Sequence, residues 1–241
     1  MSNNKRSNNR TMSQSRPIKI TPKFTTNPLG SVLIEMGETK VLCTASVEDT
    51  IPGWMRGGPR GQGWLTAEYS LLPGSTSDRS RRERQNLSGR THEIQRIIAR
   101  ALRSIVDLKL IGERTITIDC DVIQADGGTR TASITGGYVA LRLAIDALIK
   151  QNKIRTNPIR DAVAAVSVGV IEDQIFVDLD YVEDMRAEVD MNIVMTASGE
   201  LLEVQGSAEK RPFTRDQLNR MLDGAASSLK EIFEEQNAAL V

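Results

Sequence analysis

The chain has 241 residues, of which 39% are hydrophobic, so it is long enough to bury a sizeable core in one large domain. Basic and acidic residues balance at 31 each, no apolar run approaches the length of a membrane span, and the amino terminus lacks a signal-peptide core. Two cysteines and one histidine argue against a disulfide framework and against a zinc site built on paired histidines. These features predict a soluble, cytoplasmic protein that does not bind membranes.

The first part of the chain reads as a tail followed by a sheet. Residues 1–15 are polar and low in complexity, which predicts a disordered basic tail ahead of a single domain spanning 16–241. Alternating apolar residues then predict strands, the second and third of which form a hairpin across Gly37 and Glu38. The predicted strands cover residues 17–24, 31–36, 40–47 and 64–72. A long polar loop over 73–89 precedes a helix over 91–106, whose apolar residues recur at helical spacing.

Charge is unevenly distributed along this neutral chain. Ten arginines lie between Trp54 and Arg103 against four acidic residues, and several of them, including Arg79 and Arg82, fall in the long loop. Arginine matches phosphate geometry better than lysine does, so the basic segment points to an anionic partner, with RNA the leading candidate. A solvated basic face, or ion pairs with the acidic second half of the chain, would explain the same pattern without RNA.

The stretch 115–148 combines a strand, a glycine turn and a helix. Apolar residues alternate over 115–123 and later recur at helical spacing. Gly128, Thr129 and Arg130 therefore lie at or just before a helix amino terminus, where unpaired N–H groups and the helix dipole favour an anion. Arg130 adds a guanidinium that can grip phosphate through two parallel bonds. The segment predicts a phosphate site; an ordinary connection carrying a surface arginine is the alternative.

The second half of the chain returns to strands and ends in a helix. The predicted strands cover residues 162–171, 174–180, 188–196 and 200–205. The last helix is predicted to begin at a capping box formed by Thr214 and Gln217. Both halves carry a hairpin, further strands and a long helix, a pattern that is compatible with an internal duplication.

Carboxylates gather before and within one of these strands. Asp190 and Asn192 project from the strand face opposite to their apolar neighbours, and Glu183 and Asp184 lie in the connection just before that strand. A metal site needs only two of these acids, and their spacing does not say which two. Hard oxygen ligands suit Mg²⁺, which takes one or two carboxylates and keeps waters for the substrate. This grouping predicts a magnesium site; a polar strand face with acidic turns is the alternative.

Five stretches together resemble the ribonuclease PH family of phosphate-dependent 3′→5′ exoribonucleases. They are GQGWLTAEY at 61–69, GRTHEIQR at 89–96, the strand–turn–helix from 119 to 136, YVED at 181–184 with DMN at 190–192, and EVQG at 203–206. The resemblance runs from about residue 17 to the last helix. It implies a mixed-sheet α/β fold of the ribosomal protein S5 domain 2-like type with a duplicated core, and a homo-hexamer assembled as a trimer of dimers.

The resemblance also implies roles for residues at matching positions. The expected ligands of inorganic phosphate, which serves as co-substrate, are Arg90, Gly128, Thr129 and Arg130. Asp184 and Asp190 are expected to hold Mg²⁺ and to act in catalysis, with Asp184 favoured over Asp190 for protonating the leaving 3′-oxygen, either directly or through a metal-bound water. Arg79 and Arg82 are expected to contact the RNA, whereas Gly74 stands where relatives often carry another arginine.

The function implied by this resemblance is phosphorolysis of RNA from its 3′ end, above all at the 3′ ends of transfer RNA precursors and also in ribosomal RNA trimming. Phosphate would release the terminal nucleotide as a nucleoside diphosphate, and the reaction would be reversible. One rival function is that of a non-catalytic, exosome-like ring subunit that binds RNA; the presence of all the expected site residues argues against it. A second rival is a metal-dependent nuclease that hydrolyses RNA.

Overall fold

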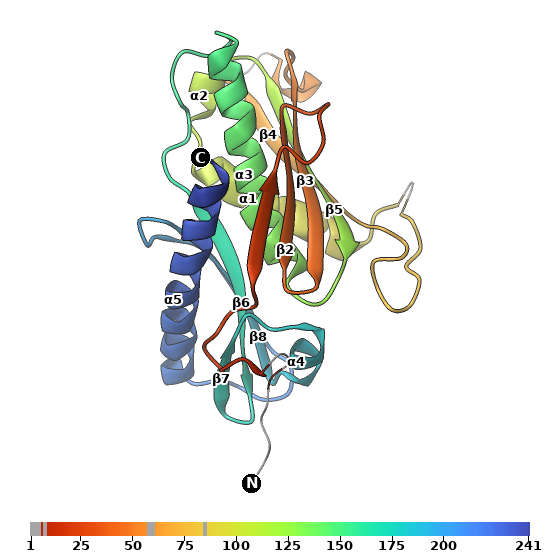
Figure 1. Cartoon of the computed structure of the whole chain (residues 1–241), viewed down its shortest axis with the longest axis vertical. Coiled ribbons are helices and arrows are strands. Elements are labelled where there is room, and N and C mark those ends of the chain that lie inside the picture. The colour runs from red at the N-terminus through yellow and green to blue at the C-terminus, as the bar shows by residue number, and fades with distance from the viewer. Residues whose placement is uncertain (1–5, 7–8, 57–60, 84–85) are drawn as a thin grey trace.

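The computed structural model describes residues 6, 9–56, 61–83 and 86–241, which form two β-sheets with helices packed against them (Figure 1). The first sheet has the strand order β1-β2-β3-β5-β4. Its neighbours are antiparallel except for β4, which runs parallel to β5. These strands are β1 (Ile18–Pro22), β2 (Gly30–Met36), β3 (Thr39–Glu48), β4 (Trp64–Leu71) and β5 (Thr115–Gln124).

The second sheet is antiparallel throughout and has the order β7-β6-β8-β9. Its strands are β6 (Val163–Ile171), β7 (Gln174–Val177), β8 (Val189–Thr196) and β9 (Leu201–Ala208). The α-helices are α1 (Gly89–Ser104), α2 (Leu108–Ile111), α3 (Thr129–Lys150), α4 (Tyr181–Arg186) and α5 (Arg215–Ala239). A short 3₁₀ helix, η2 (Gly53–Met55), lies between β3 and β4.

Helix α3 packs against both sheets and lies at the centre of the core. Its approach to the first sheet is close: a Cβ atom at Gly136 would lie 2.7 Å from Ile34 Cγ2 and 2.9 Å from Cys43 Sγ. Buried side chains from both sheets and from α1, α3 and α5 form one continuous hydrophobic core. By length and hydropathy α3 could span a membrane, but 72% of its apolar window is buried inside the protein, as in a core helix.

Several predicted elements are present, and two differ in an informative way. The hairpin across Gly37 joins β2 to β3, and Gly37 has a φ of 58°. Strand β7 ends at Val177, short of the predicted end at 180, because Asp178 adopts a left-handed backbone with a φ of 55°. The expected connection before β8 is instead helix α4, whose first turn is closed by a capping box between Asp180 and Glu183.

The prediction that residues 1–15 form a disordered tail is wrong for the part that the structure describes. Arg6 and Arg10 are only 4% and 7% exposed. Met12 accepts a backbone hydrogen bond of 2.9 Å from Val177, so this segment runs beside β7. Polar composition predicts disorder when charges lack partners, but carboxylates far along the chain supply partners here. Residues 1–5 and 7–8 of the predicted tail lie outside the described residues.

Candidate active site

The glycine turn, residues 126–130, connects β5 to α3 where the phosphate site is predicted. Gly127 and Gly128 have φ values of 71° and 64°, in the left-handed region that glycine adopts readily, and α3 begins at Thr129. The N–H groups of the first turn of α3 have no acceptor within the helix, so together with the helix dipole they favour a bound anion. The Thr129 hydroxyl lies 2.8 Å from the hydroxyl of Tyr69 on β4, which ties the turn to the first sheet.

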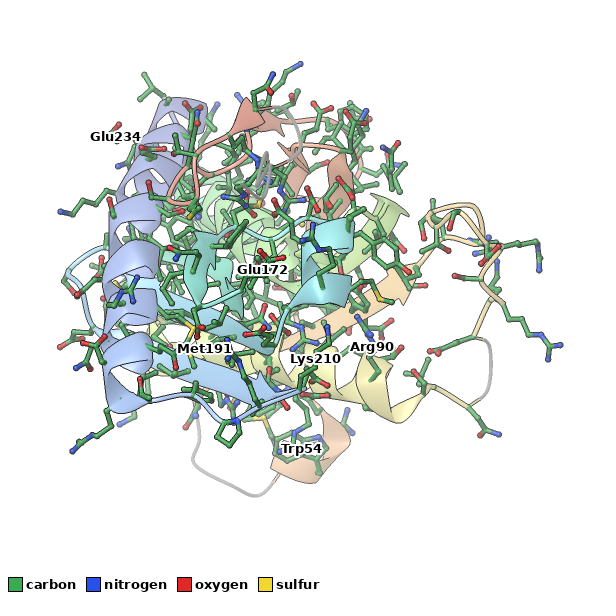
Figure 2. All side chains as sticks on the ribbon, turned by 90° about the horizontal axis from the view of Figure 1, so that it is seen from below. Trp54, Arg90, Glu172, Met191, Lys210 and Glu234 are labelled. Carbon is green, nitrogen blue, oxygen red and sulfur yellow. The ribbon has the colours of Figure 1, made fainter. Side chains whose placement is uncertain are left out.

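Arg90 approaches the same place from the start of α1, and Figure 2 shows it between the ribbons of α1 and α4. Ser88 caps this helix by accepting a hydrogen bond of 3.2 Å from the Thr91 amide, which fixes Arg90 in the first turn. Burial raises the pKa of Tyr69, and the positive charges of Arg90 and Arg130 oppose that rise. Both guanidiniums therefore lie near the tyrosine that contacts the glycine turn.

Two carboxylates lie near these arginines, one on a short helix and one on the second sheet. Asp184 belongs to α4 and Asp190 to β8. Burial raises the pKa of Asp184, while the charges of Arg90 and Arg130 lower it. Burial and the neighbouring charge of Asp184 raise the pKa of Asp190 to about 6, again against the two arginines. The four charged residues are therefore close enough to interact electrostatically, and together they form one candidate site.

Gln205 on strand β9 connects the two helices that carry the arginines. Its side-chain oxygen accepts a hydrogen bond of 2.8 Å from Arg130 Nη1, and its amide nitrogen donates to Glu93. Glu93 lies one turn after Arg90 on α1. Two successive hydrogen bonds, from Arg130 to Gln205 and from Gln205 to Glu93, therefore connect the first turn of α3 to the first turns of α1.

The carboxylate pair has the donor set that Mg²⁺ uses. The described residues contain no group of three or more histidine, cysteine, aspartate or glutamate side chains arranged to hold a metal ion. Magnesium needs only one or two protein carboxylates, because it keeps several waters and binds substrate phosphates. Asp184 and Asp190 repel each other strongly enough to raise a pKa, and a divalent cation would remove that repulsion. The residues present therefore fit Mg²⁺ better than a transition metal that requires histidine or thiolate ligands.

Arg79 and Arg82, the predicted RNA contacts, lie exposed in the long loop between β4 and α1. Figure 1 shows this loop extending outward from the first sheet. Burial raises the pKa of Asp121 on β5, and the positive charge of Arg82 partly opposes that rise, so Arg82 lies near this strand. Gly74, where relatives often carry arginine, has open space around it.

Reasoning from sequence did not single out Tyr69 or Gln205. Both lie in stretches that carry the family resemblance, GQGWLTAEY and EVQG, but a stretch does not reveal which side chain meets the site. Strand alternation placed Tyr69 in the core, where it is 5% exposed with its hydroxyl reaching Thr129. Gln205 could be read from the sequence only as a polar residue on the edge strand β9. Because polar residues on edge strands usually face solvent, this does not point to a role in the site.

Two arginines, a helix amino terminus and two carboxylates lie near one another, and this grouping makes a candidate enzyme site for an anion such as phosphate. Residues 14–145 match the model of the 3′ exoribonuclease family, domain 1, and residues 161–228 match that of domain 2. The chain therefore belongs to the 3′ exoribonuclease family, which confirms the resemblance inferred from its motifs.

Two relatives are called ribonuclease PH. The protein of Crocosphaera subtropica is 56% identical over 235 residues, covering 98% of this chain and 97% of that protein. The protein of Corynebacterium efficiens is 56% identical over 237 residues, covering 98% of this chain and 96% of that protein. Sequence identity of 56% over nearly the whole of both chains indicates membership of the same family, and not only a shared fold.

Solved structures with the same fold are more distant in sequence. Rice (Oryza sativa) Rrp46 has a TM-score of 0.78 at 19% identity, covering 98% of this chain and 99% of that chain. A chain of the Archaeoglobus fulgidus exosome with RNA bound to the active site has a TM-score of 0.79 at 18% identity, covering 96% of this chain and 92% of that chain. These likenesses confirm the predicted α/β fold class.

Proposed function

We propose that this protein is a phosphate-dependent 3′→5′ exoribonuclease that trims RNA by phosphorolysis. The observation that carries the proposal is the convergence of Arg90, Arg130 and the amino terminus of α3 beside the carboxylates of Asp184 and Asp190. The cationic groups suit inorganic phosphate, and the carboxylates suit the chemistry at the RNA end. A bound nucleotide is a poorer fit, because the turn lacks the Gly-Lys-Ser/Thr ending of a P-loop.

The reaction brings two anions together and exchanges one bond at phosphorus for another. A phosphate oxygen attacks the phosphorus of the last phosphodiester in line, and the bond to the 3′-oxygen of the preceding nucleotide breaks. The terminal nucleotide leaves as a nucleoside diphosphate, and the shortened RNA takes a proton on its new 3′-hydroxyl. Arg90, Arg130 and the Thr129 hydroxyl orient the attacking phosphate and offset its charge.

Asp184 is proposed to direct a proton to the leaving 3′-oxygen, either from its own carboxyl group or, when it is ionised and holds the metal, through a bound water, since it is the more exposed of the two carboxyl groups. Asp190, on the strand beneath, is proposed to hold Mg²⁺ together with Asp184. When bound, Mg²⁺ would supply positive charge that offsets the repulsion between phosphate and RNA. Its two protein ligands would come from different elements, α4 and β8.

The substrate is proposed to be the 3′ end of transfer RNA precursors, with ribosomal RNA as a second target. Arg79 and Arg82 are proposed to bind the RNA backbone. Their loop extends from its own subunit, so in a ring it could reach RNA that enters a neighbour's site. A cytoplasmic hexamer, built as a trimer of dimers, is the proposed assembly. Solved structures with this fold include the Archaeoglobus fulgidus exosome with RNA bound to the active site and an archaeal exosome core, and these likenesses support an assembly of several subunits.

One assay separates phosphorolysis from the rival functions. A transfer RNA precursor with extra 3′ nucleotides is incubated with Mg²⁺, with and without inorganic phosphate, and the products are identified by mass. Phosphorolysis gives nucleoside diphosphates only when phosphate is present. Nucleoside monophosphates without phosphate would indicate hydrolysis, and the absence of products would indicate a scaffold subunit.

A further inference from the structure

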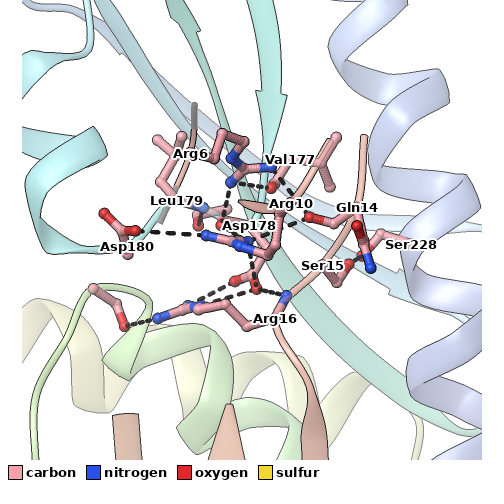
Figure 3. A network of polar contacts seen from close by, with 12 residues as sticks. Arg6, Arg10, Gln14, Ser15, Arg16, Val177, Asp178, Leu179, Asp180 and Ser228 are labelled. Carbon is pink, nitrogen blue, oxygen red and sulfur yellow. Dashed lines mark hydrogen bonds and ion pairs between the residues drawn. The ribbon is translucent and has the colours of Figure 1, made fainter. Parts of the chain in front are cut away.

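Six charged side chains form a buried cluster next to the glycine turn and α4, and Figure 3 labels five of them, all but Glu183. None of these side chains is more than 7% exposed. Three are arginines from the amino-terminal segment and three are carboxylates from the end of β7 and from α4. The arginine–carboxylate cluster consists of Arg6, Arg10, Arg16, Asp178, Asp180 and Glu183. Its charges balance, as buried charges must if they are to remain ionised.

One end of the cluster holds the glycine turn. Arg16 grips Asp178 through two bonds, Nε to Oδ2 at 2.9 Å and Nη2 to Oδ1 at 2.6 Å. Its remaining nitrogen, Nη1, donates to the carbonyl oxygens of Asp126 and Gly127 in the glycine turn. Asp178 is therefore linked to the turn through a single guanidinium. A left-handed backbone at Asp178, with a φ of 55°, aims its carboxylate at Arg16.

The other end of the cluster holds α4. Arg6 donates to both oxygens of Glu183, at 2.7 and 2.8 Å. Arg10 lies 3.4 Å from Glu183 and 3.6 Å from Asp180. Asp180 and Glu183 form the capping box of α4, and Asp184, the candidate catalytic acid, is the next residue. The amino-terminal arginines thus fix the first turn of the helix that carries Asp184.

The two ends meet where the glycine turn touches α4. A Cβ atom at Gly127 would lie 2.7 Å from both the Asp180 carbonyl carbon and the Leu179 oxygen, so the two segments are in direct contact. Asp126 also accepts a hydrogen bond of 3.3 Å from the Tyr181 amide. The phosphate side and the carboxylate side of the site are therefore joined through this contact and the cluster beneath it.

We propose that the amino-terminal segment is a positioning element of the active site, in which Arg16 with Asp178 sets the glycine turn and Arg6 with Glu183 sets α4. The inference rests on the proposed function, because it assigns the turn to phosphate and α4 to the acid. The arginines do not contact the reacting atoms. Their effect is to hold the two halves of the site at the separation that in-line attack requires, and small misplacements of reacting groups are costly.

The test uses Arg16→Lys and Arg6→Lys, which keep the buried positive charge but cannot make all the guanidinium bonds. Arg16→Lys is expected to raise the KM for phosphate about tenfold, because a single ammonium cannot hold Asp178 and both turn carbonyls. Arg6→Lys is expected to lower kcat about tenfold with an unchanged KM for phosphate, because it loosens α4 and not the turn. RNA affinity should stay the same in both variants.

The control is Arg103→Lys, which also removes a part-buried guanidinium, one bonded to the Leu65 carbonyl at 3.0 Å and stacked on Trp64. All variants are assayed below their melting temperatures, with folding checked by circular dichroism. Three results would overturn the inference: kcat and the KM for phosphate that change to the same extent in both cluster variants, the same changes in the control, or no change in any variant. A wild-type enzyme that releases no nucleoside diphosphates with phosphate would instead overturn the proposed function.

Discussion

Arg130 donates a hydrogen bond of 2.8 Å to the side-chain oxygen of Gln205, so a candidate phosphate ligand on α3 is held by an edge strand of the other sheet. Gln205 donates in turn to Glu93, one turn after Arg90. Because a neutral amide binds the guanidinium without neutralising it, the full positive charge of Arg130 remains available to phosphate. The amide orients the arginine, and the site keeps its attraction for an anion.

Gln205→Glu should weaken phosphate binding with little change in shape. A carboxylate would pair with Arg130 more strongly than the amide does and would repel Glu93, so the KM for phosphate should rise about tenfold. Gln124→Glu is a matched control, because Gln124 is also a strand glutamine that donates to a glutamate, Glu38, at 3.0 Å. Initial rates across a phosphate titration measure the effect. A KM that moves equally in both variants would contradict the role of Gln205.

Arg130→Ala should abolish phosphate-dependent trimming while leaving RNA binding largely intact. Removing one charged donor from such a site commonly costs about a hundredfold or more in rate. Arg142→Ala on the same helix is the control, because the Arg142 side chain is part-exposed and forms an ion pair with Asp146, at 3.1 Å, one turn further along the helix. Trimming rates and RNA affinity by fluorescence anisotropy are the measurements. Normal trimming by Arg130→Ala at low phosphate would remove Arg130 from the site.

Gly127→Ala should impair both stability and catalysis. Its φ of 71° is strained for alanine, at about 1–3 kcal/mol, and its new Cβ would push the glycine turn away from Asp180. Gly199→Ala separates the two effects, because Gly199 has a φ of 93° but open space where the Cβ would lie. Both variants should melt earlier than wild type, and only Gly127→Ala should lose phosphorolysis. Equal activity in the two would show that the contact with α4 is not needed.

Magnesium binding should weaken as the pH falls through about 6. Burial and Asp184 raise the pKa of Asp190 to about 6 in the folded protein without metal. Because the pKa of Asp190 is raised in the folded protein, protonation of Asp190 adds to the free energy of unfolding at acid pH. This stabilisation is lost as the pH rises through about 6, and a cation bound to the ionised carboxylates would offset the loss. Each pH unit below the pKa should lower magnesium affinity about tenfold, because a proton must leave first.

The shift of melting temperature on adding magnesium chloride measures this linkage without reference to activity. The shift should be largest near neutral pH, should shrink well below the pKa, and should be absent in Asp190→Asn at every pH. Asp223→Asn, which alters an exposed acid on α5, should keep the wild-type response. A shift that persists unchanged in Asp190→Asn would place the metal elsewhere.

Much of this fold was predictable because its signals are local. Alternation over 115–123 followed by helical spacing gave β5, the glycine turn and α3, and Gly37 marked a hairpin. Helix α4 was missed because one short turn carries no periodicity, although its capping box was readable at Asp180 and Glu183. The order of the amino-terminal segment could not be read locally, because it depends on ion pairs with residues more than a hundred positions away.

For the candidate site, the sequence indicated the charged residues but not the residues that orient them. Residue types and motifs indicated candidate phosphate ligands and a candidate acidic pair, and the charges of Arg90, Arg130, Asp184 and Asp190 act on one another in the structure. The residues that orient them, Gln205 among them, were not predictable, because their partners come from elements whose packing no periodicity describes.

The most direct test of phosphorolysis follows the phosphate itself. A transfer RNA precursor is incubated with the enzyme, Mg²⁺ and ³²P-labelled inorganic phosphate, and the nucleotides released are separated and counted. The label should appear as the β-phosphate of nucleoside diphosphates, in step with shortening of the RNA, and Arg130→Ala should give none. Unlabelled nucleoside monophosphates released at the same rate without phosphate would contradict the account.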